Sequence, residues 1–479
     1  MSAVARHPDV LIIGAGSAGS VLAERLSADP GCAVTVLEAG PGLSDAALLA
    51  LSANGLALPI GVDSPLVARY AAQLTDHPVR RVSIMRGATV GGSGAVNGGY
   101  FCRGVPADFG WAPGWASEDV IGHYRAIEAD LDFTTPAHGV SGPIPVRRVA
   151  EMCRLSETFV TYAQRAGVSW ISDLNDAGPT LPSGVGAVPL NIIDGVRTSS
   201  AAAFLLPALG RPNLTLLTRT RAVRVRFSVS RAVGVEAIGP DGPVTLSADR
   251  IVLSAGAIES AHVLMLSGIG DEGTLHSVGV ETVSALPVGM ACSDHPEWVL
   301  PATWPAETGR PPLEVVMSTS DGIEIRPYTA GFGVMAGEAA AEPPDWPHIG
   351  VALMRPRARG RITLASADPA MPPRIEHHYD SQPDDLSALQ QGCDVVCELV
   401  GSAIGAAKPS WSTSQHLCGS APMGDERDPL AVVDNRCRVH GLEGLWVIDG
   451  SILPTVTSRG PHATIVMLAH RAAEFVRTG

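Results

Sequence analysis

The sequence has 479 residues, of which 46% are hydrophobic and 17% are charged. So long a chain exceeds what one hydrophobic core normally organises, and its apolar content excludes a disordered protein, so we expect two or three domains. The formal net charge of −14 argues against a nucleic-acid partner or an anionic lipid surface, because both require a basic face.

The predicted elements begin with a βαβ unit and continue into irregular chain. An apolar strand at 9–14 is followed by a helix to about residue 26 and by a second strand that ends at Glu38. Residues 43–85 show no regular period, and we expect them to cover a bound cofactor. Residues 86–104 contain seven glycines, which indicates backbone pressed against a neighbouring group.

The turn of the βαβ unit carries the pattern G-x-G-x-x-G. Gly14 permits a tight turn, Gly16 lets the backbone approach a pyrophosphate at the helix N-terminus, and Gly19 permits close packing of the helix on the strand. Glu38 can accept hydrogen bonds from ribose hydroxyls. The expected nucleotide contacts also include the neighbouring residues Ser17, Ala18 and Ala39. This loop predicts a dinucleotide but does not distinguish FAD from NAD.

Further along the chain, helices and two groups of strands are predicted. Helices are expected at 117–131, at 154–167 and from about 259, and strands at 213–218, 222–229, 232–238 and 250–256. Short strands broken by prolines follow at 313–318, 323–328, 348–354 and 360–366, which predicts an antiparallel sheet and hence a second domain. A strand at 445–449 resembles those of the first domain, and a last helix is expected at 463–476.

Cysteines and the adjacent histidines indicate no metal centre. The eight cysteines are scattered without a CxxC pair, which is typical of reduced, mostly buried thiols in a cytoplasmic protein. His377 and His378 would point to opposite faces of a strand, so we expect both at the surface. The apolar run at 10–13 is too short for a signal peptide, and no run reaches the ~18–20 residues of a membrane helix.

Several motifs in a fixed order resemble the glucose–methanol–choline (GMC) family of FAD-dependent oxidoreductases. These motifs are RGATVGGSGAVNG from Arg86, RIVLSAGAIESAHVLMLSGIG from Arg250, GRITLASADPAMPPRIEHHY from Gly360, HLCGSAPMG from His416 and LWVIDGSILPTVTSRGPHATIVMLAH from Leu445. The resemblance implies an α/β fold with a Rossmann-like FAD-binding domain and a discontinuous antiparallel-sheet (α+β) substrate domain. It implies an FAD-binding domain at 1–296, with parts of 105–210 on the substrate side. The substrate domain is expected at 297–412, and 413–479 returns to the first domain with the catalytic histidines.

The resemblance also implies roles for individual residues. The flavin is expected beside Arg86, Gly92, Asn97 and Gly98, the adenosine half beside Val223, Ala255 and Gly256, the ribityl–pyrophosphate chain beside Asp449 and Gly450, and the isoalloxazine beside His462 and Thr464. Val96 stands where some members carry the histidine that tethers FAD, so a non-covalent cofactor is expected. His295 is expected to have a structural role near the flavin.

Alcohol oxidation requires a group that takes the hydroxyl proton while flavin N5 takes the hydride, and histidine suits the first task. The resemblance makes His416 this general base and gives His462 a hydrogen bond to the substrate oxygen. The ordinary alternatives are a buried histidine bonded to a backbone carbonyl for His416 and a helix-capping residue for His462.

The short chain, the variant GGSGAVNGGYFCRG and the histidine at position 462 also resemble a narrower group, the GMC dehydrogenases associated with the peptide-derived cofactor mycofactocin. This resemblance implies an alcohol or reduced mycofactocin as substrate and a respiratory carrier or quinone-like electron acceptor. With no signal peptide or membrane helix in the sequence, we expect a cytoplasmic protein, or one that meets the membrane peripherally through its acceptor. Three alternatives remain open: an alcohol oxidase that makes peroxide, a lyase with structural FAD, and a non-enzymatic flavin-bound electron-transfer partner.

Overall fold

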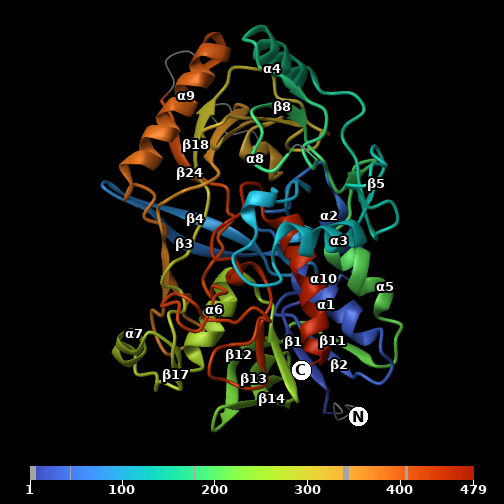
Figure 1. Cartoon of the computed structure of the whole chain (residues 1–479), viewed down its shortest axis with the longest axis vertical. Helices are drawn as coiled ribbons and strands as arrows, with labels where there is room; N and C mark the ends of the chain where they lie inside the picture. Colours follow the sequence, from blue (N-terminus) through green and yellow to red (C-terminus); the bar gives the residue numbers. More distant parts are fainter. Residues whose placement is uncertain (1–6, 44, 177, 338–344, 405–407, 479) are drawn as a thin grey trace.

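The chain folds around a parallel sheet at one end and a larger antiparallel sheet at the other, with a long hairpin between them (Figure 1). The computed structural model describes residues 7–43, 45–176, 178–337, 345–404 and 408–478.

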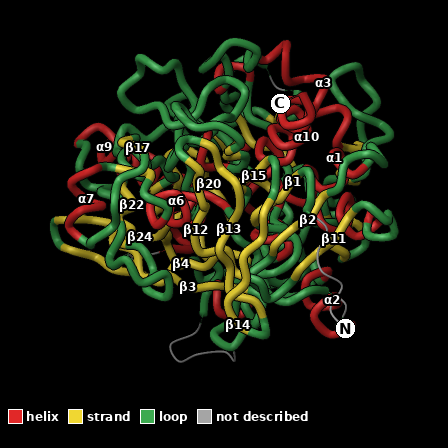
Figure 2. Tube along the Cα trace, turned by 90° about the horizontal axis from the view of Figure 1, so that it is seen from below, coloured by secondary structure: helices red, strands yellow, loops and turns green. Residues whose placement is uncertain are grey.

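The parallel sheet has the strand order β11-β2-β1-β15-β25. Its strands are β1 (Val10–Ile13), β2 (Val34–Leu37), β11 (Leu214–Leu217), β15 (Arg250–Leu253) and β25 (Leu445–Val447). The sequence VLII of β1 is buried throughout, as expected for a central strand covered on both faces. Two helices, α1 (Ser17–Ser27) and α10 (His462–Thr478), lie side by side in both ribbon views (Figures 1 and 2). This arrangement confirms the predicted Rossmann-like domain.

The loops that follow the parallel strands meet at one edge of the sheet. The G-x-G-x-x-G turn follows β1, Glu38 follows β2, and Asp449 follows β25. Helix α6 (Gly256–Leu266) begins directly after β15. Because the carboxyl ends of parallel strands lie together, this edge is the usual ligand site of such a sheet.

The antiparallel sheet has the strand order β24-β18-β21-β20-β19-β8-β7. Its strands are β7 (Trp170–Ile171), β8 (Gly184–Ala187), β18 (Pro296–Pro301), β19 (Val315–Ser318), β20 (Ile323–Pro327), β21 (His348–Leu353) and β24 (Ser410–Thr413). The only parallel pair among these described strands is β7 with β8. The predicted sheet-rich substrate domain is therefore confirmed. Helix α9 (Pro383–Ile404), which the sequence did not predict, packs on this sheet, and Gly392 allows close approach to the Val351 side chain.

A four-stranded sheet with the order β22-β23-β3-β4 corrects two predictions. The segment 43–85 is not irregular, because it contains helix α2 (Ala46–Ala53) and the long hairpin of β3 (Val67–Asp76) and β4 (Val79–Gly87). The strand predicted at 360–366 is β22 (Arg361–Thr363), which joins this hairpin through β23 (Arg374–Glu376) rather than the larger sheet.

The strands predicted at 222–229 and 232–238 form a separate antiparallel sheet. They are β12 (Arg221–Ser228) and β13 (Arg231–Gly239), and β14 (Gly242–Ser247) completes the sheet. The predicted helices at 117–131 and 154–167 are present as α3 (Ser117–Ile127) and α4 (Arg154–Arg165). The remaining elements are β5 (Glu128–Asp130), β6 (Ile144–Val146), β9 (Ile192–Ile193), β10 (Val196–Arg197), α5 (Leu206–Ala208), β16 (Ile269–Gly270), α7 (Glu272–Ser277), β17 (Ser284–Ala285), α8 (Phe332–Met335) and the short helical turns Gly92–Ala95, Pro106–Asp108, Ala201–Leu205 and Gly450–Ile452.

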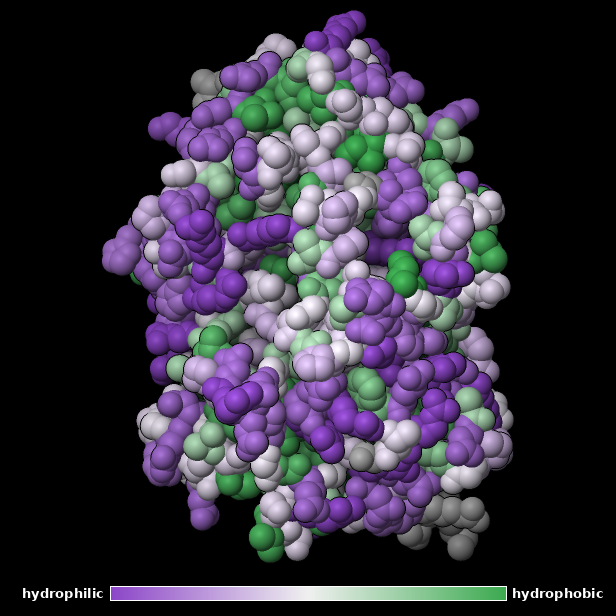
Figure 3. Space-filling model, in the orientation of Figure 1, coloured by the Kyte–Doolittle hydropathy of each residue, from purple (hydrophilic) through white to green (hydrophobic). Residues whose placement is uncertain are grey.

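The surface and interior agree with most of the compositional expectations. All eight cysteines are unpaired, and six of them are buried. Among the described helices, none combines the length and the apolar character needed to cross a membrane. The face shown in Figure 3 mixes polar and apolar side chains. The prediction for His377 is wrong: its side chain is buried, with Nδ1 3.5 Å from Asp294 Oδ2, whereas His378 is partly exposed and bonded to Asp76.

Candidate active site

One cavity of about 810 Å³ runs from the carboxyl edge of the parallel sheet to the antiparallel sheet. Gly14, Gly16 and Glu38 line one end, and Glu297, Arg326 and His416 line the other. Its volume lies within the range of pockets that bury a large organic ligand.

The end at the parallel sheet fits a dinucleotide. Gly16 precedes α1 with φ −75° and no side-chain cap, and a Cβ placed there would lie 3.7 Å from the Gly92 Cα. A side chain at this point would therefore be tolerated by the backbone but would enter the cavity. Gly14 has a φ of +100°, which favours glycine. The uncapped amides at the start of α1 are the donors that a pyrophosphate requires.

The carboxylate of Glu38 is fixed by backbone amides in this end of the cavity. Ala15 N donates to Oε2 at 3.0 Å, and Gly40 N donates to Oε1 at 2.8 Å. Burial raises the pKa of Glu38, against the lowering effect of these two hydrogen bonds. The remaining acceptor capacity of both oxygens is available to ribose hydroxyls.

The structure brings most of the expected cofactor residues to this cavity. Those that line it are Gly14, Gly16, Ser17, Ala18, Glu38, Ala39, Arg86, Gly92, Asn97, Gly98, Ala255, Gly256, Asp449, Gly450 and His462. Gly19 does not line the cavity, because it packs against the Gly14 carbonyl, where a Cβ would clash. Val223 does not line the cavity either, whereas the preceding residues Arg221 and Ala222 do. Thr464 is also absent from the lining, and its hydroxyl lies 2.6 Å from that of Tyr124.

Two charged residues in the middle of the cavity have different partners. Asp449 accepts hydrogen bonds from Gly256 N at 2.8 Å and Ser260 Oγ at 2.6 Å, so it ties β25 to the start of α6. Arg86 donates through Nη1 to Gln415 Oε1 at 3.3 Å, while its buried Nη2 has no partner among the described residues. Burial lowers the pKa of Arg86. A hydrogen-bond acceptor on a bound ligand would satisfy this buried N–H at the cavity wall.

A hydrogen-bonded pair of histidines determines the tautomer of His416. His295 Nε2 lies 2.9 Å from the Thr457 carbonyl oxygen, which can only accept, so Nε2 carries a proton. Burial lowers the pKa of His295 to about 4, so the ring is neutral and its Nδ1 is an acceptor. His416 Nδ1 lies 2.9 Å from that atom and must donate to it. His416 Nε2 is therefore left with a free lone pair.

The electrostatic surroundings keep His416 neutral. Burial lowers the pKa of His416 well below its usual value, and the neighbouring His295, Arg326 and Arg86 lower it further. Its backbone N–H donates to Asp294 Oδ1 at 2.7 Å, which fixes the chain at this point. A neutral histidine with a free Nε2 at the cavity wall has the form that a general base requires.

His462 lies between the two ends of the cavity, at the first position of α10. Its Nδ1 is 3.3 Å from Ser17 Oγ, and its buried Nε2 has no partner among the described residues. Burial lowers its pKa to about 4, and the charge of Arg197 contributes. The ring can therefore offer one hydrogen bond to a ligand, while its other nitrogen faces the nucleotide loop.

The end at the antiparallel sheet contains residues that the sequence analysis did not select. Glu297, Arg326, Tyr328 and Ser414 form a hydrogen-bonded group there. Charged residues alternate in the otherwise apolar strand IEIRP of β20, and all five residues are buried. Such alternation places Glu324 and Arg326 on one face of the strand, and this signal could have identified them.

Comparison with known proteins identifies the family of the chain. The two sequence profiles described as GMC oxidoreductase match residues 8–297 and 356–469. An uncharacterized GMC-type oxidoreductase in the thcA 5′ region of Rhodococcus erythropolis is 40% identical, covering 98% of each chain. A glucose dehydrogenase [FAD, quinone] of Drosophila melanogaster is 31% identical, covering 98% of this chain and 86% of its own. An oxygen-dependent choline dehydrogenase of Brucella anthropi is 30% identical, with 98% and 95% covered.

Solved structures agree in fold. Pyridoxine 4-oxidase from Mesorbium loti superimposes with a TM-score of 0.88 at 26% identity, covering 98% of this chain and 99% of its own. A formate oxidase gives a TM-score of 0.87 at 20% identity, covering 100% and 99%, which shows likeness of fold alone.

Proposed function

The chain belongs to the GMC oxidoreductase family, and from this premise we propose that it is an FAD-dependent dehydrogenase in which His416 takes the hydroxyl proton of an alcohol. That it is an oxidoreductase acting on CH–OH donors follows from the family and its relatives. The proposal for His416 is carried by one observation, the hydrogen-bond chain from Thr457 through His295 that leaves His416 Nε2 unprotonated.

The residues of the chain divide the chemical work between binding and proton transfer. The start of α1, Glu38 and the Arg86 guanidinium would hold FAD, which supplies the hydride acceptor when it is bound. His416 Nε2 would accept the hydroxyl proton, and His462 Nε2 would donate a hydrogen bond to the same oxygen as negative charge develops on it.

Replacement of His416 tests this assignment. His416→Ala should retain FAD but slow anaerobic flavin reduction by an alcohol by ~10²–10⁴-fold, the usual contribution of a general base. The loss should be partly relieved at high pH, where more alkoxide exists. An unchanged reduction rate, followed by stopped-flow absorbance, would remove His416 from the mechanism.

We also propose that FAD is held without a covalent bond. Val96 is a buried aliphatic residue that packs with Leu66 and Ala95, and it offers no nucleophile. Acid precipitation should release yellow flavin into the supernatant. Flavin that stays in the protein pellet would contradict the proposal.

For the electron acceptor, we propose a respiratory carrier or a quinone-like compound rather than oxygen, and we propose a small-molecule alcohol or reduced mycofactocin as the substrate. The relatives include a quinone-dependent glucose dehydrogenase and an oxygen-dependent choline dehydrogenase, so an alcohol oxidase is the competing function. Reduced enzyme should reoxidise slowly in air and rapidly with a quinone or dye. Rapid, stoichiometric peroxide formation would make the protein an oxidase, and absence of flavin bleaching by any alcohol would favour a lyase.

A further inference from the structure

Four buried charges form the wall of the cavity beside the antiparallel sheet. Glu297 on β18 and Arg326 on β20 line the cavity and are 2% and 4% exposed. Glu324 and Arg459 are fully buried behind them and form an ion pair with each other. The cluster of Glu297, Glu324, Arg326 and Arg459 thus contains two carboxylates and two guanidinium groups, so its net charge is zero.

The charged atoms that face the cavity are already engaged within the protein. Glu297 Oε1 accepts from the Tyr328 hydroxyl at 3.0 Å, and Oε2 accepts from Arg326 Nη1 at 3.1 Å and from Ser414 Oγ at 2.8 Å. Arg326 also donates through Nε to Glu324 Oε1 at 2.8 Å, while its Nη2 lies 3.5 Å from the Met354 sulfur. Neither side chain has an uncompensated charge to offer a ligand.

Apart from neutral polar side chains on and after β24 (Ser412, Thr413, Ser414 and Gln415), much of this wall is apolar or aromatic. The residues that line it include Leu58, Ile60, Pro312, Leu313 and Phe332. The rings of Tyr328 and Phe332 meet edge to face at 5.0 Å. An ionic group buried against this surface would lose its hydration without gaining a counter-charge, which is strongly unfavourable. Arg86 adds positive charge near His416 and opposes a cation further. Its unpaired Nη2 would be taken by FAD under the proposed function, so it is not a counter-charge for a substrate carboxylate.

We propose that this cavity selects uncharged alcohols with an apolar or aromatic body and rejects alcohols that carry an ammonium or a carboxylate group. Glu297 and Arg326 would be the residues that determine this specificity, through their mutual neutralisation. The inference rests on the proposed alcohol oxidation. It also separates this chain from relatives named as choline dehydrogenases, because choline carries a fixed positive charge.

Alcohols matched in shape and different in charge test the proposal. The neutral 4-ethylbenzyl alcohol, the cationic 4-(aminomethyl)benzyl alcohol and the anionic 4-(hydroxymethyl)phenylacetate are compared at pH 7.5 with the FAD-loaded enzyme. Choline and its uncharged carbon isostere 3,3-dimethylbutan-1-ol form a second, aliphatic comparison. The apparent second-order rate constant of anaerobic flavin reduction should be at least about ten-fold higher for each neutral alcohol than for its charged counterparts. A difference of this size is expected when one buried charge has no partner. Equal rates, or faster reduction by choline, would overturn the proposal.

Two variants should shift this preference in opposite directions. Arg326→Met leaves the cluster with a net negative charge and should move the neutral-to-cation ratio toward the ammonium alcohol by at least about ten-fold. Glu297→Gln leaves a net positive charge and should move the neutral-to-anion ratio toward the carboxylate alcohol. Arg427→Met, which removes an exposed arginine outside the cavity, is the matched control and should change neither ratio. Variants that slow all alcohols equally would show a structural role only and would contradict the proposed specificity.

The same measurements distinguish this inference from the proposed function. If none of the alcohols reduces the flavin, the proposed function fails. The charge preference is then tested by binding alone, with the dissociation constant of each alcohol measured from the change in flavin absorbance. Tighter binding of the neutral alcohols would support the inference in that case, and equal or weaker binding would overturn it.

Discussion

At the scale of single residues, the site depends on which nitrogen of a histidine carries a proton. His295 appeared in the sequence analysis as a structural residue near the flavin, and its contacts give that role a specific content. It bonds to a backbone carbonyl on one side and to His416 on the other. We therefore propose that His295 is a positioning residue, which holds the ring of His416 in the tautomer that leaves Nε2 free.

Replacement of His295 should therefore impair His416 without loss of the cofactor. His295→Phe removes the acceptor for the His416 Nδ1 proton, and we expect flavin reduction to slow about 10–100-fold, the usual effect of removing a group that orients a working histidine. Wild-type reduction should be nearly constant from pH 8 to pH 6, because the pKa of His416 lies well below its usual value. The variant should lose this constancy, whereas His295→Gln, which retains an acceptor, should restore part of the rate. His276→Phe, at an exposed histidine, is the control, and an unaltered pH profile in His295→Phe would contradict the positioning role.

Two glycines of the nucleotide loop should respond differently to a side chain. Gly16→Val should fold and purify largely colourless, because its backbone tolerates a Cβ that would project toward the pyrophosphate position. Gly19→Val should instead fail to accumulate as folded protein, because its Cβ would clash with the Gly14 carbonyl. Flavin content per folded protein and the near-ultraviolet circular dichroism separate the two effects. A normal flavin content in Gly16→Val would place the pyrophosphate elsewhere.

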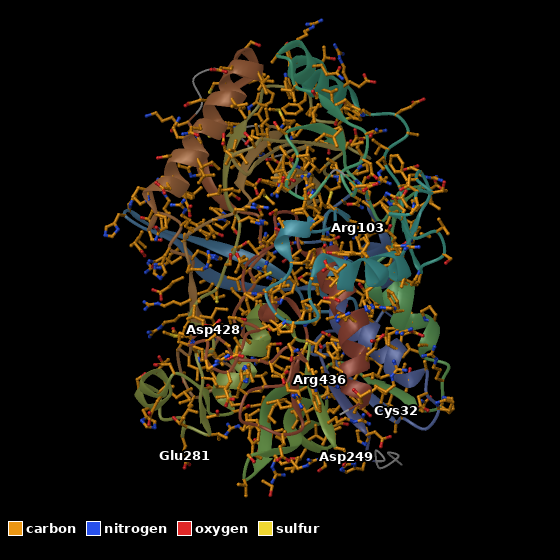
Figure 4. All side chains as sticks on the ribbon, viewed as in Figure 1. Cys32, Arg103, Asp249, Glu281, Asp428 and Arg436 are labelled. Atoms are coloured by element: carbon orange, nitrogen blue, oxygen red, sulfur yellow. The ribbon has the colours of Figure 1, made fainter. Side chains whose placement is uncertain are left out.

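At the scale of elements, a buried ion cluster joins β5 to the loops around it. His138 Nε2 lies 2.7 Å from Asp173, and Nδ1 lies 3.1 Å from Asp130 and 3.4 Å from Glu128. Arg103, labelled in Figure 4, pairs with Glu128 and also lies over the Tyr124 ring of α3. With Arg148 on Asp130 and Asp173, three cations balance three carboxylates. The carboxylates of Glu128 and Asp130, which lie near His138, are thus already paired with Arg103 and Arg148.

Loss of His138 should destabilise the fold in a manner that depends on pH. Burial disfavours the charged ring, but the close carboxylates of Asp130 and Glu128 and the hydrogen bond to Asp173 outweigh burial and raise the pKa of His138 to about 11. Because the folded-state pKa exceeds the usual 6.5, the stabilisation is complete below pH 6.5 and declines as pH rises toward 11. His138→Phe should lower the free energy of unfolding by about 3 kcal/mol at pH 6, as expected when one partner of a buried ion cluster is removed. Denaturant titrations of the wild type and the variant give their free energies of unfolding at pH 6 and pH 9.5. The difference between the two proteins should be smaller at pH 9.5, and an equal difference at both pH values would contradict the charged state of His138.

The sequence predicted those features whose determining residues lie close together in the chain, and it did not predict those that depend on residues far apart. The nucleotide loop and the paired motifs around His416 and His462 carry their own glycines and histidines, so their arrival at one cavity could be expected. Helix α9 was missed because Gly392 and Gly401 weaken its local preference, although Gly392 is required for contact with β21. The burial of Glu297 and Arg326 was not predicted, because their compensation comes from strands that pair only in the folded sheet.

At the scale of the whole molecule, buried neutral histidines make stability sensitive to acid. Burial lowers the pKa of His295, His377, His462 and His470 to about 4. Between pH 6.5 and pH 4 the unfolded chain binds these protons and the folded chain does not, so stability falls as pH falls, by about 1.4 kcal/mol per pH unit for each histidine.

The FAD-loaded enzyme should therefore show a steep fall in Tm below pH 6.5. His470→Phe, outside the cavity lining, should reduce this pH dependence while flavin reduction stays unchanged. Differential scanning calorimetry across pH 4.5–7.5 measures how Tm changes with pH in the wild type and in the variant. A Tm that is constant across this range would show that these histidines are protonated in the folded protein.

The cofactor end of the cavity is built from segments that lie far apart in the sequence. The strand β1 is central in its sheet, whereas the edge strand β25, the Asp449 loop and the first residue of α10 are synthesised long after it. A nascent chain on the ribosome therefore has the nucleotide loop long before it has a closed binding site. We therefore expect flavin capture to wait until Asp449 and His462 have left the ribosome, because only then are both parts of the site present.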